Sequence, residues 1–143
     1  MKIKKALKEK NKLVSKLSSE FLKVSAYNSV EEGTTPPYDP KQALETVMST
    51  IDQLVDLKTR IHRANAKVYD KIFRMAELKS IVKQIKSVDC TSGKTSDRWS
   101  RETPIVKVAA ISVVERDQLV EKIEAEIEKL QEELDAHNAK VNV

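Results

Sequence analysis

Helix-breaking residues are nearly absent from this chain, and their scarcity restricts its fold more than any other feature. The 143 residues include only two glycines and four prolines, three of the prolines lying within 36–40 and the fourth being Pro104. Glycine and proline are the residues that most often interrupt helices. We therefore predict a single helical domain over residues 1–143, with connector loops near 28–40 and 89–104.

Composition favours paired helices over a thick globular core. Charged residues make up 34% of the chain and aromatic residues 4%, so few large side chains remain to fill a compact interior. Ile105, Val106, Val108 and Ile111 form a β-favouring run, which predicts one short β segment near 105–111. The predicted fold class is mainly α, with long amphipathic helices in an antiparallel bundle or a coiled-coil-like oligomer.

Apolar residues recur at helical spacing in four segments. In the first, from about Ile3 to Ala26, the residues Leu7, Val14 and Phe21 are seven positions apart. The rows expected on the packing faces of the later helices are Leu44, Met48, Ile51, Leu54 and Val55; Val68, Ile72, Met75, Val82, Ile85 and Val88; and Leu119, Val120, Ile123, Ile127, Leu130 and Leu134. These rows are more than one thin chain readily covers, so we expect at least a dimer.

Local patterns mark the ends of these helices. Asp39 followed by Pro40 suits a helix start, because aspartate caps free backbone N–H groups and proline fits the first helical position. A kink or break is expected near Asn65, between the second and third helices. Ser112 with Glu115 three residues later matches a capping box and predicts the start of the last helix.

Charge is distributed unevenly along the chain, although the total is only +4 and the pI is near 9.1. Residues 1–30 hold eight lysines and two glutamates, whereas residues 115–135 hold nine acidic and three basic residues. Opposite charges attract, so we expect these two segments to attract each other. The positive total also permits an anionic partner.

The sequence predicts a cytoplasmic protein without a cofactor, metal site or catalytic centre. Cys90 is the single cysteine, and with His62 and His137 it cannot form the usual four-ligand zinc site. No stretch approaches the roughly 18 apolar residues of a membrane span, and no export signal is recognisable. None of these three side chains has an identifiable catalytic partner, so we predict that the protein is not an enzyme.

Several short sequence motifs follow one another in an order that covers most of the chain. They are Arg-Ile-His-Arg-Ala-Asn at 60–65, Asp-Arg-Trp-Ser-Arg at 97–101, Val-Lys-Val at 106–108 and Glu-Leu-Asp at 133–135, followed by Asn138. This pattern resembles the septicolysin-like family of small helical bacterial and phage proteins. Members look to carry threonine where this chain has Ala64, which weakens any role for that hydroxyl. The resemblance implies a helical fold, a bacterial or phage-infected host cell as the location, and no established enzymatic activity.

The first candidate ligand site lies in the second helical segment. Arg60, Arg63 and Asn65 combine two guanidinium groups, each able to bind two phosphate oxygens at once, with an amide. The alternative is a solvated basic face with polar groups, such as Asn65, that set the register of a helical seam.

The second candidate cluster is Arg98, Trp99 and Arg101. The indole could stack on a base while the guanidinium groups hold phosphate. A tryptophan in a loop is also an ordinary packing anchor between helices or subunits, and both readings stay open.

Two functions are compatible with these features. The first is a non-enzymatic homo-oligomer that binds a small anionic, nucleotide-like molecule, for example a phage sponge that sequesters a nucleotide immune signal as anti-defence. The second is a helical adaptor or scaffold that acts through protein–protein contacts only. The lysines of the first helix share their segment with apolar rows, which favours a partner helix over nucleic acid.

Overall fold

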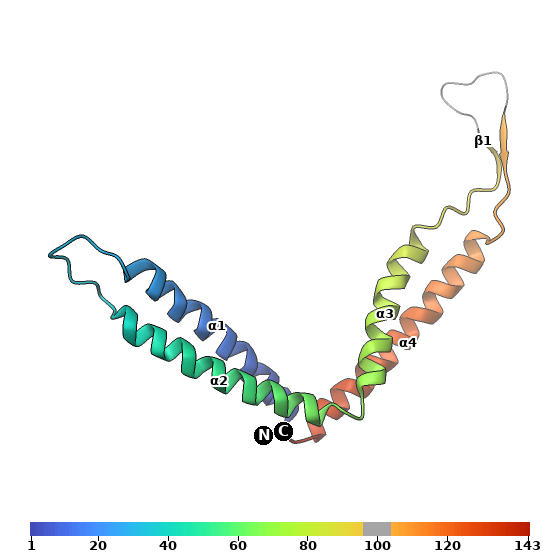
Figure 1. Ribbon diagram of the computed structural model, residues 1–143. Helices are drawn as coiled ribbons and strands as arrows, with labels where there is room; N and C mark the ends of the chain where they lie inside the picture. Colours follow the sequence, from blue (N-terminus) through green and yellow to red (C-terminus); the bar gives the residue numbers. More distant parts are fainter. Residues whose placement is uncertain (96–103) are drawn as a thin grey trace. The chain divides into compact units, whose positions relative to one another are not determined.

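The computed structural model describes residues 1–95 and 104–143 and confirms a mainly α fold. Its elements in chain order are α1 (Ile3–Tyr27), α2 (Pro40–Ala64), α3 (Tyr69–Lys86), β1 (Gly93–Thr95), β2 (Ile105–Lys107) and α4 (Val113–Lys140) (Figure 1). The chain divides into two compact units, which are described separately. The first comprises 1–67 with 136–143, and the second comprises 68–135.

The helix ends follow the local signals in the sequence. The Asp39 carboxylate accepts a hydrogen bond from the backbone N–H of Lys41 at 2.9 Å, and Pro40 is the first residue of α2. The Ser112 hydroxyl accepts one from the backbone N–H of Glu115 at 3.1 Å, just inside α4. Such side-chain acceptors satisfy N–H groups that have no partner within the helix. The break expected near Asn65 is confirmed, since Asn65 caps the end of α2.

We expect Asp39→Ala to lower the free energy of unfolding by about 0.5–2 kcal/mol, the usual loss for removing an N-cap acceptor. Urea unfolding followed by circular dichroism measures this difference. Asp39→Asn is the matched variant, because asparagine keeps an acceptor oxygen and should retain most of the stability. Equal losses in the two variants would contradict a capping role.

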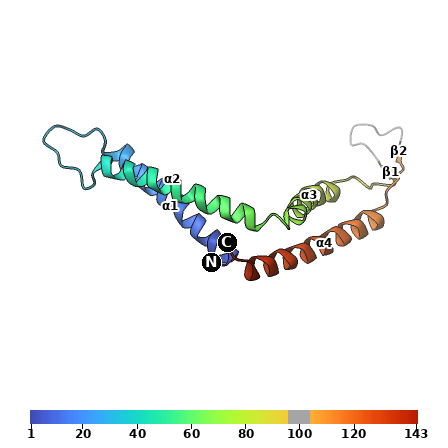
Figure 2. The same cartoon turned by 60° about the horizontal axis from the view of Figure 1, so that its bottom comes forward.

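The first unit is an antiparallel pair formed by α1 and α2, which lie side by side in both views (Figures 1 and 2). Ala6 and Leu13, from the early part of α1, cluster with Leu57 and Ile61, from the end of α2. The end of the chain returns to the same cluster, since Val143 packs against it. A backbone bridge between Lys2 and Asn142 also joins the two ends of the chain.

The row of α2 that packs on α1 is not the row that hydrophobicity suggests. The buried residues of α2 are Ala43, Val47, Thr50, Leu57 and Ile61. Thr50 is fully buried, and its hydroxyl donates to the Thr46 carbonyl at 2.7 Å. The expected packing row of Leu44, Met48, Ile51 and Val55 is exposed, while Leu54 is half-buried. The expectation that this row packs within one chain is therefore wrong. Each of the four exposed residues lies one position after a residue of the row that packs on α1, which we call the seam.

The second unit pairs α3 with α4. Its core consists of Leu78 and Val82 from α3 and Val120 and Ile123 from α4. Some residues expected on these packing faces lie outside the core, since Val88 and Leu119 are exposed. The polar residues around the core form ion pairs between the two helices, described below.

A small antiparallel sheet completes the second unit. Lys94 in β1 lies opposite Val106 in β2. The β segment expected near 105–111 is confirmed for Ile105–Lys107, whereas Val108 and Ile111 follow it outside the strand. The predicted loop near 89–104 contains β1, which the sequence did not predict.

Candidate functional site

Half of the predicted ligand-binding residues lie near the end of α2. Arg60 and Arg63 are exposed, and the Arg60 guanidinium is 3.0 Å from the Asp56 carboxylate. Asn65 follows as the cap, with its side-chain Oδ1 buried and without a hydrogen-bond partner among the described residues. An orphaned acceptor calls for a donor, which a phosphate group in its charged form does not supply. The two arginines are thus better placed than Asn65 for an anion.

The other three predicted residues, Arg98, Trp99 and Arg101, lie outside the described residues. Their predicted role in binding a nucleotide-like ligand stays a prediction.

Within residues 1–95 and 104–143, no group of three or more metal-ligating side chains is found. Cys90 is buried, and its Sγ lies 3.6 Å from the Val88 carbonyl oxygen. Over the same residues, no helix has the length and apolarity to cross a membrane.

The ion pairs of the second unit show which helix positions share a face. An ion pair of 2.6 Å joins Lys86 to Glu124. Lys86 follows the flanking residue Ile85, and Glu124 follows the core residue Ile123. Arg74 and Glu126 are joined at 2.9 Å, and each comes one position before a partly buried residue of its helix, Met75 and Ile127. In an antiparallel pair, the position after the seam on one helix therefore lies on the same side as the position after the seam on the other.

This rule assigns one side of the α1–α2 pair to apolar residues. Val14 follows the buried Leu13, and Leu44, Met48 and Ile51 follow Ala43, Val47 and Thr50 in the same way. Phe21 continues the row seven positions after Val14, and Val55 follows Leu54, which packs against the core cluster. We define the apolar face as Val14, Phe21, Leu44, Met48, Ile51 and Val55. Their exposed fractions run from 36% at Ile51 to 58% at Val55.

The opposite side of the same pair is polar and positively charged on α1. Lys2, Lys5 and Lys12 each precede a buried residue of α1 by one position. The corresponding residues of α2, which precede its seam positions, are Gln42, Thr46, Ser49, Gln53, Asp56 and Arg60. One side of the α1–α2 pair is thus apolar over the stretch that holds these six residues, and the other side is polar. By the same rule Lys4, Lys58 and His62, which follow Ile3, Leu57 and Ile61, lie on the apolar side beyond that stretch.

Three acidic residues of α4 form ion pairs with basic residues of α3. Glu133 accepts a hydrogen bond from Lys71 at 2.6 Å, and Glu126 accepts two from the Arg74 guanidinium at 2.9 and 3.3 Å. These hydrogen bonds hold the pKa of each carboxyl below its ordinary value of 4.5. Glu124, Glu126 and Glu133 thus pair with cations of α3, and the expected attraction between residues 1–30 and 115–135 stays a prediction.

The pKa shifts predict acid sensitivity in the second unit. A depressed folded-state pKa contributes stability above pH 4.5 that is lost as the pH falls through the folded value. We expect unfolding by acid to begin at a higher pH in Lys71→Ala/Arg74→Ala than in the control Lys79→Ala/Lys83→Ala. Circular dichroism between pH 6 and 2 measures the midpoint of acid unfolding in each variant. The difference between the midpoints should be up to about one pH unit, the usual spread of carboxyl pKa values in proteins. Coincident midpoints would contradict a role for these pairs.

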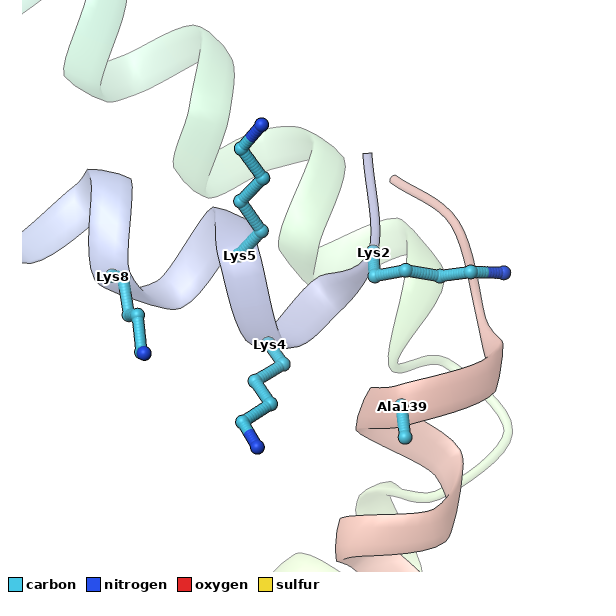
Figure 3. A pocket seen from close by; sticks show the side chains of 5 residues that line it. All are labelled: Lys2, Lys4, Lys5, Lys8 and Ala139. Carbon is cyan, nitrogen blue, oxygen red and sulfur yellow. The ribbon is translucent and has the colours of Figure 1, made fainter.

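A hollow at the beginning of α1 gathers four cations. We call it the lysine hollow; it has a volume of about 330 Å³ and is lined by Lys2, Lys4, Lys5, Lys8 and Ala139 (Figure 3). The Lys2 ammonium donates to the Lys140 carbonyl at 2.6 Å. Positive charges in the first turns of a helix interact unfavourably with its dipole. Each exposed charge costs about 0.3–1 kcal/mol of helix stability. The sequence pattern alone predicts no small-molecule site at these lysines.

Comparison with known proteins identifies a family. The model of a family of unknown function, DUF6847, matches residues 8–143. Neither the curated proteins nor the solved structures contain a match. The resemblance to septicolysin-like proteins stays a prediction.

Proposed function

This chain belongs to the DUF6847 family of unknown function, so its role must be argued from its surfaces, and we propose a non-enzymatic helical homo-oligomer. In this proposal the apolar face of α1–α2 is the contact between copies. The main support is the exposed row of Leu44, Met48, Ile51 and Val55. Successive residues of this row are alternately four and three positions apart, the same spacing as in the buried row beside it.

The size of this face supports a stable contact. Each of the two helices has 25 residues, which at about 1.5 Å per residue gives a length of roughly 38 Å. Two helices side by side are about 20 Å wide, so one face offers roughly 750 Å². A standard protein–protein interface buries about 800 Å² on each partner. One whole side of the pair is therefore close to the area that a specific interface requires. The apolar face spans 44–55 on α2, roughly 17 Å, and would form the centre of such a contact.

A second copy is the occupant that best fits this face. Two antiparallel pairs that stack face to face form a four-helix arrangement, the common solution for covering such rows. A twofold contact needs a surface that complements itself, and a row of aliphatic side chains does so without opposing like charges.

Light scattering at micromolar concentration tests the assembly, with a dimer or larger species as the expected result. Because the contact is apolar, the species should persist from about 0.05 to about 1 M salt, where exposed ion pairs are screened. A monomer at either salt concentration would contradict the proposal.

The second candidate function is capture of a small anionic, nucleotide-like molecule by this oligomer, as in a phage sponge. It is supported by Arg60 and Arg63, which are exposed and lie one helical turn apart. Native mass spectrometry of protein purified from cells should then show a releasable nucleotide. Bare oligomers would instead favour an adaptor or scaffold that acts through protein contacts alone.

A further inference from the structure

We propose that the lysine hollow binds the phosphate group of a phosphorylated small molecule whose other end is apolar or aromatic. This site differs from the Arg60–Arg63 cluster and from the apolar face. It therefore does not depend on oligomer formation.

The walls and rim of the hollow differ in chemistry. In Figure 3 the ammonium groups of Lys2, Lys4, Lys5 and Lys8 point in different directions, so their aliphatic stems line the hollow and their charges lie around it. Lysine stems pack readily on apolar surface while the ammonium stays in water. Ala139 adds an apolar wall from the opposite end of the chain. A ligand with one apolar and one anionic end matches this arrangement.

The electrostatics of the hollow are unfavourable without an anion. None of the five lining residues is acidic, and the first turn of α1 contains no acidic residue. The nearest glutamate in sequence, Glu9, lies 3.9 Å from Lys12, which does not line the hollow. Lys4 and Lys8 are four positions apart, where like charges destabilise a helix. An anion would reverse both the repulsion and the conflict with the helix dipole.

Phosphate is the anion that these groups suit best. Lysine is a common phosphate ligand that acts as a compact point charge on a flexible stem. The ammonium groups that point apart in Figure 3 can therefore turn toward a group carrying two or more negative charges. The volume of about 330 Å³ lies at the lower end of the range for small-molecule pockets. The proposed ligand is therefore a free phosphorylated metabolite of roughly mononucleotide size.

The test compares two triple variants with equal charge loss. Lys4→Gln/Lys5→Gln/Lys8→Gln removes three lining cations, whereas Lys12→Gln/Lys16→Gln/Lys41→Gln removes three exposed cations elsewhere on the same unit. Calorimetric titration with adenosine diphosphate at constant ionic strength should show affinity reduced about tenfold or more in the first variant and nearly unchanged in the second. Equal losses in both variants, no loss in either, or no binding to the unaltered protein would overturn the proposal.

Two further arms identify the source of the phosphate. Inorganic pyrophosphate should bind more weakly than the nucleotide, because it leaves the lysine stems uncovered; equal affinities would overturn the role of the stems. Binding confined to vesicles with phosphatidic acid would overturn the assignment to a free metabolite.

Arg60→Gln/Arg63→Gln should retain nucleotide binding, which separates this site from the second candidate function; loss of binding in that variant alone would overturn the proposal. Without ligand, the lining variant should melt at a higher temperature than the unaltered protein, because the repulsion at the start of α1 is gone. A lower melting temperature would contradict the electrostatic argument.

Discussion

Leu57→Ala is expected to lower the free energy of unfolding by about 2–5 kcal/mol, the range for removing a buried leucine side chain. Leu57 is only 3% exposed and belongs to the cluster that joins α1 to α2. A typical domain has about 5–15 kcal/mol in total, so this loss is a large share. Urea unfolding followed by helical circular dichroism measures it.

The matched control for this substitution is Leu22→Ala. Leu22 is 67% exposed on α1 and lies outside the apolar face, so its truncation should change the unfolding free energy by about 0.5 kcal/mol or less. A similar loss in both variants would mean that the Leu57 cluster is not the core of the first unit.

Met48→Glu combined with Val55→Glu is expected to convert the oligomer into a folded monomer. The two residues are 57% and 58% exposed in one chain, so glutamate there should leave the α1–α2 pair intact. At a contact between copies, however, the carboxylates would be buried without partners, at several kcal/mol each. Sedimentation velocity measures the species, and circular dichroism measures the helical content.

Gln42→Glu with Ser49→Glu is the control for this pair. It introduces the same charges with the same seven-residue spacing, but on the polar face of α2. It should remain oligomeric. Dissociation of both variants would implicate general charge repulsion in place of the apolar face.

The sequence predicts the helices and their ends well because these depend on neighbouring residues. Asp39, Pro40 and Ser112 act within one turn of their own positions, so their signals are complete in a short window. The strand β1 contains Gly93, Lys94 and Thr95, of which only threonine favours strands, and it pairs with β2. Its existence depends on a partner beyond the window and was missed.

The choice between neighbouring apolar rows is harder to predict. The buried row of α2 contains Ala43 and Thr50, which are weakly hydrophobic, whereas the next row contains Leu44 and Met48. Hydrophobicity alone therefore selects the exposed row. Small seam residues allow two helices to approach closely, so geometry outweighs the larger side chains.

The candidate sites show the same limit. Arg60 and Arg63 are neighbours on one helix and could be grouped from spacing alone. The lysine hollow combines the first eight residues with Ala139, from the opposite end of the chain. A contact between the two ends of the chain leaves no periodic pattern in the sequence. Without knowledge of that contact, the lysines resemble an ordinary solvated surface.

Photo-crosslinking from position 48 is the most direct test of the central claim, that the apolar face of α1–α2 is the contact between copies. A photoreactive phenylalanine derivative in place of Met48 should give covalent dimers, with the crosslink mapping to the apolar face of the second copy. The same group in place of Ser49, on the polar face, should give almost none. Absence of dimers from position 48, or equal yields from both positions, would contradict the claim.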